Sequence, residues 1–312
     1  MSARSLALHL GLVVALFALN FVLPPYTHGN IARVMTLAVY AIGYNIAFGY
    51  TGLLSLGHAM FFAAGMYGAG LLLQFTTLNA VAALAAGLLC GGGLALVVGL
   101  LALRTIGVAF MIVTLMFSQA CYLTILYFGD ITHGDEGFVI PSARRIVAGF
   151  DLGDAQVRYL VAWALFSTAL LFTLWLVNRP TGRVFVAIRE NEPRARLLGY
   201  DTFRMKLRAL VLSGTIAGAG GAAYGLLFGY VGASFAGVQY SIFPLLWVLL
   251  GGAGTVIGPF FGVLFMFYLI DLTSGLTDAY MLFAGIALVA LTLFAPQGIA
   301  GELRRRNWAR LP

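Results

Sequence analysis

Residues 209–270 read ALVLSGTIAGAGGAAYGLLFGYVGASFAGVQYSIFPLLWVLLGGAGTVIGPFFGVLFMFYLI and contain no Asp, Glu, Lys or Arg. A soluble domain carries about a quarter charged residues, so water would not solvate such a stretch. Placing one Arg at the centre of a membrane helix costs about 2.5–3.5 kcal/mol. Charged residues therefore mark the boundaries of membrane segments, and this stretch predicts several segments buried in a lipid bilayer.

The rest of the chain has the same character. Of its 312 residues, 61% are hydrophobic and only 9% are charged. A helix needs about 20 apolar residues to cross a bilayer, so ten helices would use about two thirds of the chain. The composition predicts an all-α integral membrane protein of about ten transmembrane helices. The predicted spans are 6–23, 31–49, 58–75, 79–103, 106–128, 158–178, 207–231, 239–252, 258–272 and 279–295.

Two of these spans need comment. The first runs from Leu6 to Leu23 and ends in Pro24-Pro25 without an Ala-x-Ala-like cleavage site, so we interpret it as an uncleaved membrane helix. The span 239–252 is short and ends in a glycine-rich segment, and a broken or re-entrant helix is an alternative there. The cysteines Cys90 and Cys121 lie inside apolar runs and are interpreted as packing residues.

The charged clusters give the spans an orientation. Residues 179–208 contain eight Arg or Lys side chains against three acids, and the tail adds four arginines, whereas 129–157 is mainly acidic. Basic loops stay in the cytoplasm. We therefore expect one transmembrane domain over 1–312, with both termini cytoplasmic. In this topology 129–157 is a periplasmic loop, 179–206 a cytoplasmic loop and 297–312 a basic cytoplasmic tail.

Motifs for chemistry are absent from the sequence. There is no Walker A motif, no metal-spaced cluster and no nucleophile motif. We expect no catalytic residue, no metal ligand and no bound cofactor, and the confinement of basic residues to loops argues against nucleic acid as a partner. A secondary transporter shows ionisable residues at membrane depth, and the spans are almost free of them, so we expect a partner to supply the driving force.

Glycines form two kinds of pattern. One set recurs at helical spacing and predicts close helix packing, or alternatively the wall of a narrow pathway: Gly214, Gly218, Gly221, Gly225 and Gly229. The segments 49–58 and 251–259 instead predict helix interruptions, which a membrane tolerates only beside protein or a water-filled cavity. Their candidate pathway-lining residues are Gly52, Ser55, Gly57, His58, Gly252, Gly254 and Gly258. A lone histidine such as His58 is more often a capping or packing residue.

The basic loop contains a predicted short helix. Asn191 can cap its start, Pro193 favours its first turn and Gly199 suits the position after its end. The helix is either a solvated connector or a docking surface with an exposed Leu197-Leu198 pair. The candidate docking residues are Glu192, Pro193, Arg194, Arg196, Leu197, Leu198 and Gly199.

Three stretches carry a resemblance to a known family. Residues 44–67 read YNIAFGYTGLLSLGHAMFFAAGMY, and residues 182–201 read GRVFVAIRENEPRARLLGYD. The third stretch runs from Lys206 through Gly214 and the glycine series to residues 250–259, which read LGGAGTVIGP. In this order and spacing they resemble the LivM-type permease subunits of branched-chain amino acid ABC transporters. The resemblance covers most of the chain from residue 31 to 296.

The resemblance implies a type II-like ABC importer permease in the bacterial inner membrane. It implies a LivH-like second permease subunit, two cytoplasmic ATPase subunits that bind the ATP, and a periplasmic substrate-binding protein. The helix at 192–199 would be the element that couples to the ATPase, similar to the EAA loop of other importers, although Glu192-Pro193-Arg194 replaces Glu-Ala-Ala. Expected substrates are Leu, Ile and Val or related small amino acids. Urea, amides, simple sugars and aromatic acids are same-superfamily alternatives, and a standalone channel or a membrane enzyme is a more distant one.

Overall fold

A computed structural model describes residues 3–147, 149–275, 279, 282, 285–286, 289 and 297–307. The described part is almost entirely helical, as expected. The exceptions are two-residue strands that form two antiparallel pairs, β1 with β4 and β2 with β3. Most of the predicted span 279–295 lies outside the described residues.

The elements follow one another along the chain with short connections. The helices are α1 (Ala3–Leu19), α2 (Pro25–Asn45), α3 (Ala59–Phe75), α4 (Ala80–Ala102), α5 (Val108–Tyr127), α6 (Gly129–Thr132), α7 (Ala155–Asn178), α8 (Pro180–Leu197), α9 (Thr202–Phe228), α10 (Val238–Gly251), α11 (Gly258–Ser274) and α13 (Gly298–Asn307). A π-helical turn η1 (Ile46–Tyr50) extends α2, and the 3-10 turns are η2 (Ser142–Arg144) and η3 (Ala233–Ala236). The strands are β1 (Phe138–Val139), β2 (Ile146–Val147), β3 (Phe150–Asp151) and β4 (Tyr230–Val231).

The apolar helices fall into two length classes. Among the described residues, five helices are long and apolar enough to cross a membrane: Tyr26–Tyr50, Ala80–Ala102, Val108–Tyr127, Ala155–Asn178 and Thr202–Phe228. Four are shorter: Leu6–Leu19, Ala59–Phe75, Val238–Gly251 and Gly258–Ser274. At about 1.5 Å per residue, the 14-residue α10 is about 21 Å long, less than the roughly 30 Å of a bilayer core. The chain is thus a multi-pass membrane protein with apolar helices of two lengths.

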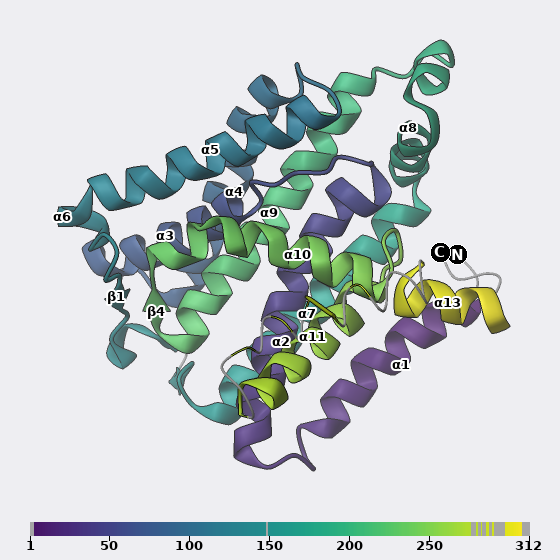
Figure 1. The fold of residues 1–312 in the computed structure, drawn as a ribbon. Helices are drawn as coiled ribbons and strands as arrows, with labels where there is room; N and C mark the ends of the chain where they lie inside the picture. Colours follow the sequence, from purple (N-terminus) through teal and green to yellow (C-terminus); the bar gives the residue numbers. More distant parts are fainter. Residues whose placement is uncertain are drawn as a thin grey trace.

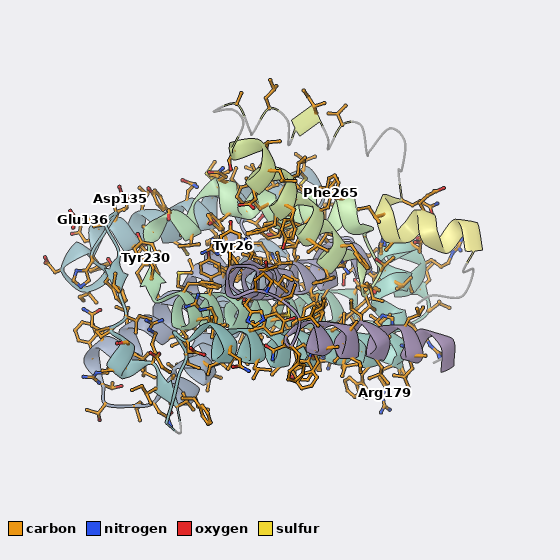
Figure 2. All side chains as sticks on the ribbon, turned by 90° about the horizontal axis from the view of Figure 1, so that it is seen from below. Tyr26, Asp135, Glu136, Arg179, Tyr230 and Phe265 are labelled. Carbon is orange, nitrogen blue, oxygen red and sulfur yellow. The ribbon has the colours of Figure 1, made fainter. Side chains whose placement is uncertain are left out.

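Helix α9 lies at the centre of the bundle. It packs against α2, α3 and α4, while α10 and α11 pack against each other and against α2. The two ends of the bundle differ. One, here called the loop end, carries α6, β1 and β4, and the other, the α8 end, carries α8 and α13 (Figure 1). Figure 2 shows Asp135 and Glu136 at the loop end and Arg179 at the opposite end.

Glycines set how closely α9 approaches its neighbours. A methyl group on Gly218 would lie 2.7 Å from the carbonyl oxygen of Gly87, and one on Gly221 would lie 1.9 Å from that of Phe62. Gly214 is equally restricted, because its methyl would lie 2.3 Å from the β-carbon of Ala95. These three glycines lie where backbones are in contact, which is how small residues stabilise helix pairs in lipid.

The last two glycines of the series have looser or different environments. The nearest atom to a methyl on Gly225 would be a side-chain carbon of Met66 at 3.3 Å. Gly229 is not part of the helix surface. It has φ +74° and ends α9, its N–H bonding the carbonyl of Gly225 at 2.8 Å. The regular spacing continues past the end of the helix, which is why the sequence pattern included Gly229.

We expect Gly221→Ala to destabilise the bundle and Gly93→Ala to leave it unchanged or slightly more stable. The first substitution forces α3 and α9 apart, and overpacking of this kind costs about 1–3 kcal/mol. Gly93 lies in α4 with nothing within 4 Å of an added methyl. Thermal unfolding of the purified protein in detergent measures the difference. Equal melting temperatures for the two variants would contradict the close contact at Gly221.

Candidate functional site

The second part of α8 is a short helix with its own start. Asn191 has φ −160° and ψ 94°, so it breaks α8 into two segments. Its side-chain Oδ1 accepts a hydrogen bond from the Arg194 N–H at 2.9 Å. This is the geometry of an N-cap, in which a side-chain oxygen satisfies one of the free N–H groups of the first turn. Residues 192–197 are called the capped helix below.

The end of the capped helix is also fixed. Gly199 has φ +88°, and its N–H bonds the Arg196 carbonyl at 3.0 Å, while the Tyr200 N–H bonds the Ala195 carbonyl at 3.3 Å. This pair of bonds defines a Schellman motif, which depends on a glycine at the left-handed position. The motif leaves Leu197 and Leu198 at the tip of the loop, 88% and 70% exposed.

An ionic cluster holds the capped helix against α9. Glu192 forms salt bridges with Lys206 and, at 3.5 Å, with Arg196, which also donates to the Thr202 hydroxyl at 3.3 Å. Partial burial alone would raise the pKa of Glu192. The hydrogen bond and charge of Lys206, the Thr202 hydroxyl and the Arg196 charge outweigh burial and lower this pKa below its usual value. Glu192 is therefore ionised at neutral pH.

A small apolar cluster supports the same contact. Val184, Ile188 and Ala195 are buried together, with Met205 of α9 packed against them. Both segments of α8 contribute to it, and α9 contributes Met205. The capped helix is thus attached to the bundle on one face by apolar and ionic contacts. On the other face it presents two leucines to solvent.

Arg189 connects α8 to both glycine-rich segments named above, 49–58 and 251–259. Its guanidinium Nη1 donates a hydrogen bond to the Gly49 carbonyl oxygen. A methyl on Gly254 would lie 2.7 Å from the same Nη1, and a methyl on Gly52 would lie 3.3 Å from the Arg189 Cγ. The sequence pattern placed Arg189 only in a basic cluster. No motif indicates its role, because the residues it contacts are far away in the chain.

Asn45, near the end of α2, holds the same two segments together. Its Nδ2 donates to the Thr255 carbonyl at 2.8 Å, and its Oδ1 accepts from the Gly254 N–H at 3.0 Å. The side chain is buried. Its two hydrogen bonds satisfy backbone groups that the turn after α10 leaves without helical partners. Without them, each buried group would cost about 1–3 kcal/mol.

The first interruption, residues 51–58, runs from the α8 end into the middle of the bundle. The Leu56 N–H bonds the Thr114 hydroxyl at 3.2 Å, and Thr114 lies inside the long helix α5. A methyl on Gly57 would lie 1.9 Å from the Thr114 carbonyl oxygen, so only glycine fits there. Helix α3 then begins at Ala59, inside the bundle.

A further interruption, residues 229–237, precedes α10. The Ser118 hydroxyl, also inside α5, approaches the Ala236 carbonyl at 3.5 Å, and α10 begins two residues later at Val238. The Ala59 N–H at the start of α3 bonds the Ser241 hydroxyl in the first turn of α10 at 3.1 Å. The start of α3, which is buried, therefore meets the buried Ser241 in the first turn of α10, although Val238 and Gln239 before it are exposed.

An internal repeat marks these two interruptions in the sequence. Phe48-Gly49-Tyr50-Thr51-Gly52 is followed by Gly57 and α3, and Phe228-Gly229-Tyr230-Val231-Gly232 is followed at the same spacing by Gly237 and α10. The first copy lies in the segment 49–58 that is predicted as a helix interruption, whereas the second was not predicted. Broken helices in corresponding positions of two halves are typical of transporters that bind substrate near the bilayer midplane.

His58 precedes α3 and is fully buried. Its side chain makes no capping hydrogen bond. Its Nε2 lies 2.8 Å from the Ser213 Oγ, and that hydroxyl donates to the Gly43 carbonyl. The Nε2 must therefore carry the proton, and His58 packs against Tyr44 and Phe61. The arrangement is that of a structural histidine joining α2, α3 and α9.

The other candidate pathway residues differ in how exposed they are to solvent. Gly52 is exposed and borders a cavity of about 630 Å³ between residues 51–54, the turn after α4 and the capped helix. Gly254 is partly exposed beside Arg189. The remaining ones, Ser55, Gly57, Gly252 and Gly258, are buried. Within the residues that the structure describes, no three His, Cys, Asp or Glu side chains are grouped as metal ligands.

Comparisons with known proteins show the family of the chain. The family model described as branched-chain amino acid transport system / permease component matches residues 27–292. The LivM permease protein of the high-affinity branched-chain amino acid transport system of Escherichia coli is 28% identical over 287 residues, which cover 85% of this chain and 68% of that protein.

Two further relatives extend the comparison. A probable branched-chain amino acid transport permease protein LivM of Methanocaldococcus jannaschii is 29% identical over 61% of this chain and 59% of its own length. The LivH permease protein of Salmonella typhimurium is 23% identical over 86% of this chain and 92% of its own. No solved structure gives a significant match. Because the family model covers most of its length, the chain belongs to the family of permease components of branched-chain amino acid transport systems.

Proposed function

We propose that this chain is one of the two membrane-spanning subunits of an ABC importer for branched-chain amino acids, and that the capped helix couples it to an ATPase subunit. The family match over residues 27–292 supports the class. The observation that carries the coupling role is the capped helix itself. It is fixed at both ends and attached to the bundle on one side, and it presents Leu197 and Leu198 to solvent on the other.

The proposed assembly contains a LivH-like second permease subunit, two ATPases and a substrate-binding protein. We place the ATPases at the α8 end, in the cytoplasm, and the binding protein at the loop end, in the periplasm. The basic residues between Arg179 and Arg208 and the acidic residues of 129–157 support this orientation. The proposed topology is ten spans of a type II-like permease in the inner membrane, with both termini cytoplasmic.

The contacts of Arg189 give coupling a physical route. When the ATPases close, they move the capped helix and with it the rest of α8. Arg189 carries this movement to Gly49, just before the interruption at residues 51–58, and to Gly254, in the turn after α10. The interruption at 51–58 leads to the start of α3, which meets the first turn of α10 at Ala59 and Ser241. We propose that separation of these two helix starts opens the pathway.

The double variant Leu197→Asp/Leu198→Asp is expected to abolish coupling. Burying one leucine contributes about 1.5–3 kcal/mol, so replacing two with charges should weaken ATPase docking by at least a hundredfold. Both residues are exposed, so the fold and membrane insertion should be retained. Leucine uptake by the assembled importer and copurification of the ATPases are the measurements.

Leu197→Met/Leu198→Met is the matched control, because it keeps the apolar surface, and it should transport normally. Uptake at the wild-type rate by the double Asp variant would show that this loop is a solvated connector. The coupling surface would then lie elsewhere.

Arg189→Met should uncouple ATP hydrolysis from transport. The variant keeps the capped helix, so the ATPases still bind, but the link to the carbonyl of Gly49 is lost. We expect the amount of leucine transported per ATP hydrolysed to fall about tenfold in proteoliposomes. Arg183→Met, on the same helix segment and also exposed, is the control and should leave this ratio unchanged. An unchanged ratio in Arg189→Met would exclude Arg189 as the connecting residue.

A further inference from the structure

A second cavity lies between α2, α9, α10 and α11, toward the loop end. Its volume is about 410 Å³, within the usual range for small-molecule sites. Its walls include aromatic residues, Tyr224, Phe243 and Trp247 among them. Two side chains of opposite charge also line it, Arg33 of α2 and Asp271 of α11. No sequence motif indicates a role for either residue.

Arg33 and Asp271 do not form a salt bridge with each other. The salt bridges in the described part of the chain all lie near the α8 end, joining Glu192 to Arg196 and Lys206, and Arg204 to Asp201. Both Arg33 and Asp271 are exposed, and both lie on apolar helices, where a charged residue is costly and usually marks a substrate pathway.

The position of Arg33 is fixed by an aromatic ring. Its guanidinium carbon lies 4.9 Å from the ring centroid of Phe228, at the end of α9. This cation–π contact uses the face of the guanidinium and leaves its N–H groups free to bind a carboxylate in its plane. On α10, Phe243 and Trp247 stack at 5.7 Å and continue the aromatic wall toward the α8 end.

We propose that this cavity binds a free α-amino acid with an apolar side chain on its way into the pathway. Arg33 would bind the carboxylate, Asp271 the ammonium group, and the aromatic wall the side chain. This inference rests on the proposed transport function and assigns a binding site to its substrate. Sugars, urea and amides carry no net charges, so they would not require a cation and an anion in one cavity.

One residue of the cavity wall is next in sequence to the contact between α3 and α10. Tyr240 lines it, and the Tyr240 carbonyl accepts a hydrogen bond from the Tyr40 hydroxyl at 2.9 Å. The next residue, Ser241, makes the contact with Ala59 that joins the starts of α10 and α3. An amino acid in the cavity would thus lie next to the contact that we propose opens during transport.

The test uses the complete importer in proteoliposomes, with leucine uptake and ATPase stimulation by leucine-loaded binding protein measured together. Arg33→Met and Asp271→Asn should each reduce leucine uptake at least tenfold, as expected for loss of one charge-assisted hydrogen bond. Stimulation of the ATPase should remain, because docking of the binding protein does not use the cavity. Arg33→Lys keeps the cation and should restore part of the uptake. Asp130→Asn removes an exposed carboxylate elsewhere near the loop end and should have no effect.

Photo-leucine, a diazirine analogue of leucine, locates the site directly. Illumination during turnover should attach it to residues of the cavity wall on α10, and Arg33→Met should remove that labelling. If the wild-type importer does not transport leucine, the proposed function itself fails. If it does, and both charge variants match it in uptake and labelling, the function stands and the cavity proposal fails. Loss of uptake and ATPase stimulation together would also overturn the cavity proposal, because it would assign these residues to docking or assembly.

Discussion

The structure depends on how backbone polar groups are satisfied where helices break inside the membrane. Lipid offers no hydrogen bonds, so every free N–H and C=O group at such a break needs a partner from the protein. The Leu56 N–H bonds the hydroxyl of Thr114, and the Ala59 N–H bonds that of Ser241. Asn45 bonds both backbone groups that it can reach in the turn after α10. These side chains explain why hydroxyl and amide groups are buried within so apolar a bundle.

The same contacts explain how a movement at one end of the molecule could reach its centre. The interruptions are held by a few directional hydrogen bonds and by close backbone contacts at glycine, and both are discrete arrangements. Arg189 contacts both glycine-rich segments, 49–58 and 251–259, next to the capped helix. The two segments of α8 and a small number of contacts therefore connect the exposed Leu197-Leu198 pair to the segment that leads to the start of α3 and to the turn after α10.

The sequence predicted local features well because local chemistry determines them. The charge-free run over 209–270 predicted buried helices, and Asn191 and Gly199 predicted both ends of the capped helix. The contacts of Arg189 could not be predicted, since they join residues about 140 and 65 positions apart in the chain. The interruption before α10 was overlooked because Gly229 fits the helical spacing of the glycines of α9 and was counted with them, and the similarity to residues 48–57 reveals it. The role of the pathway residues stays a prediction, and the span 279–295 lies mostly outside the described residues.

The central claim is that the starts of α3 and α10 separate when substrate passes. A cysteine pair at Ala59 and Ser241, in a chain whose Cys90 and Cys121 have been replaced, allows a direct measurement. After closure with a short thiol-specific cross-linker that a reductant can cleave, leucine uptake by the assembled importer should stop, while ATP hydrolysis stimulated by the loaded binding protein continues. Cleavage of the cross-link should restore uptake. Uptake at the normal rate in fully cross-linked protein would contradict the account.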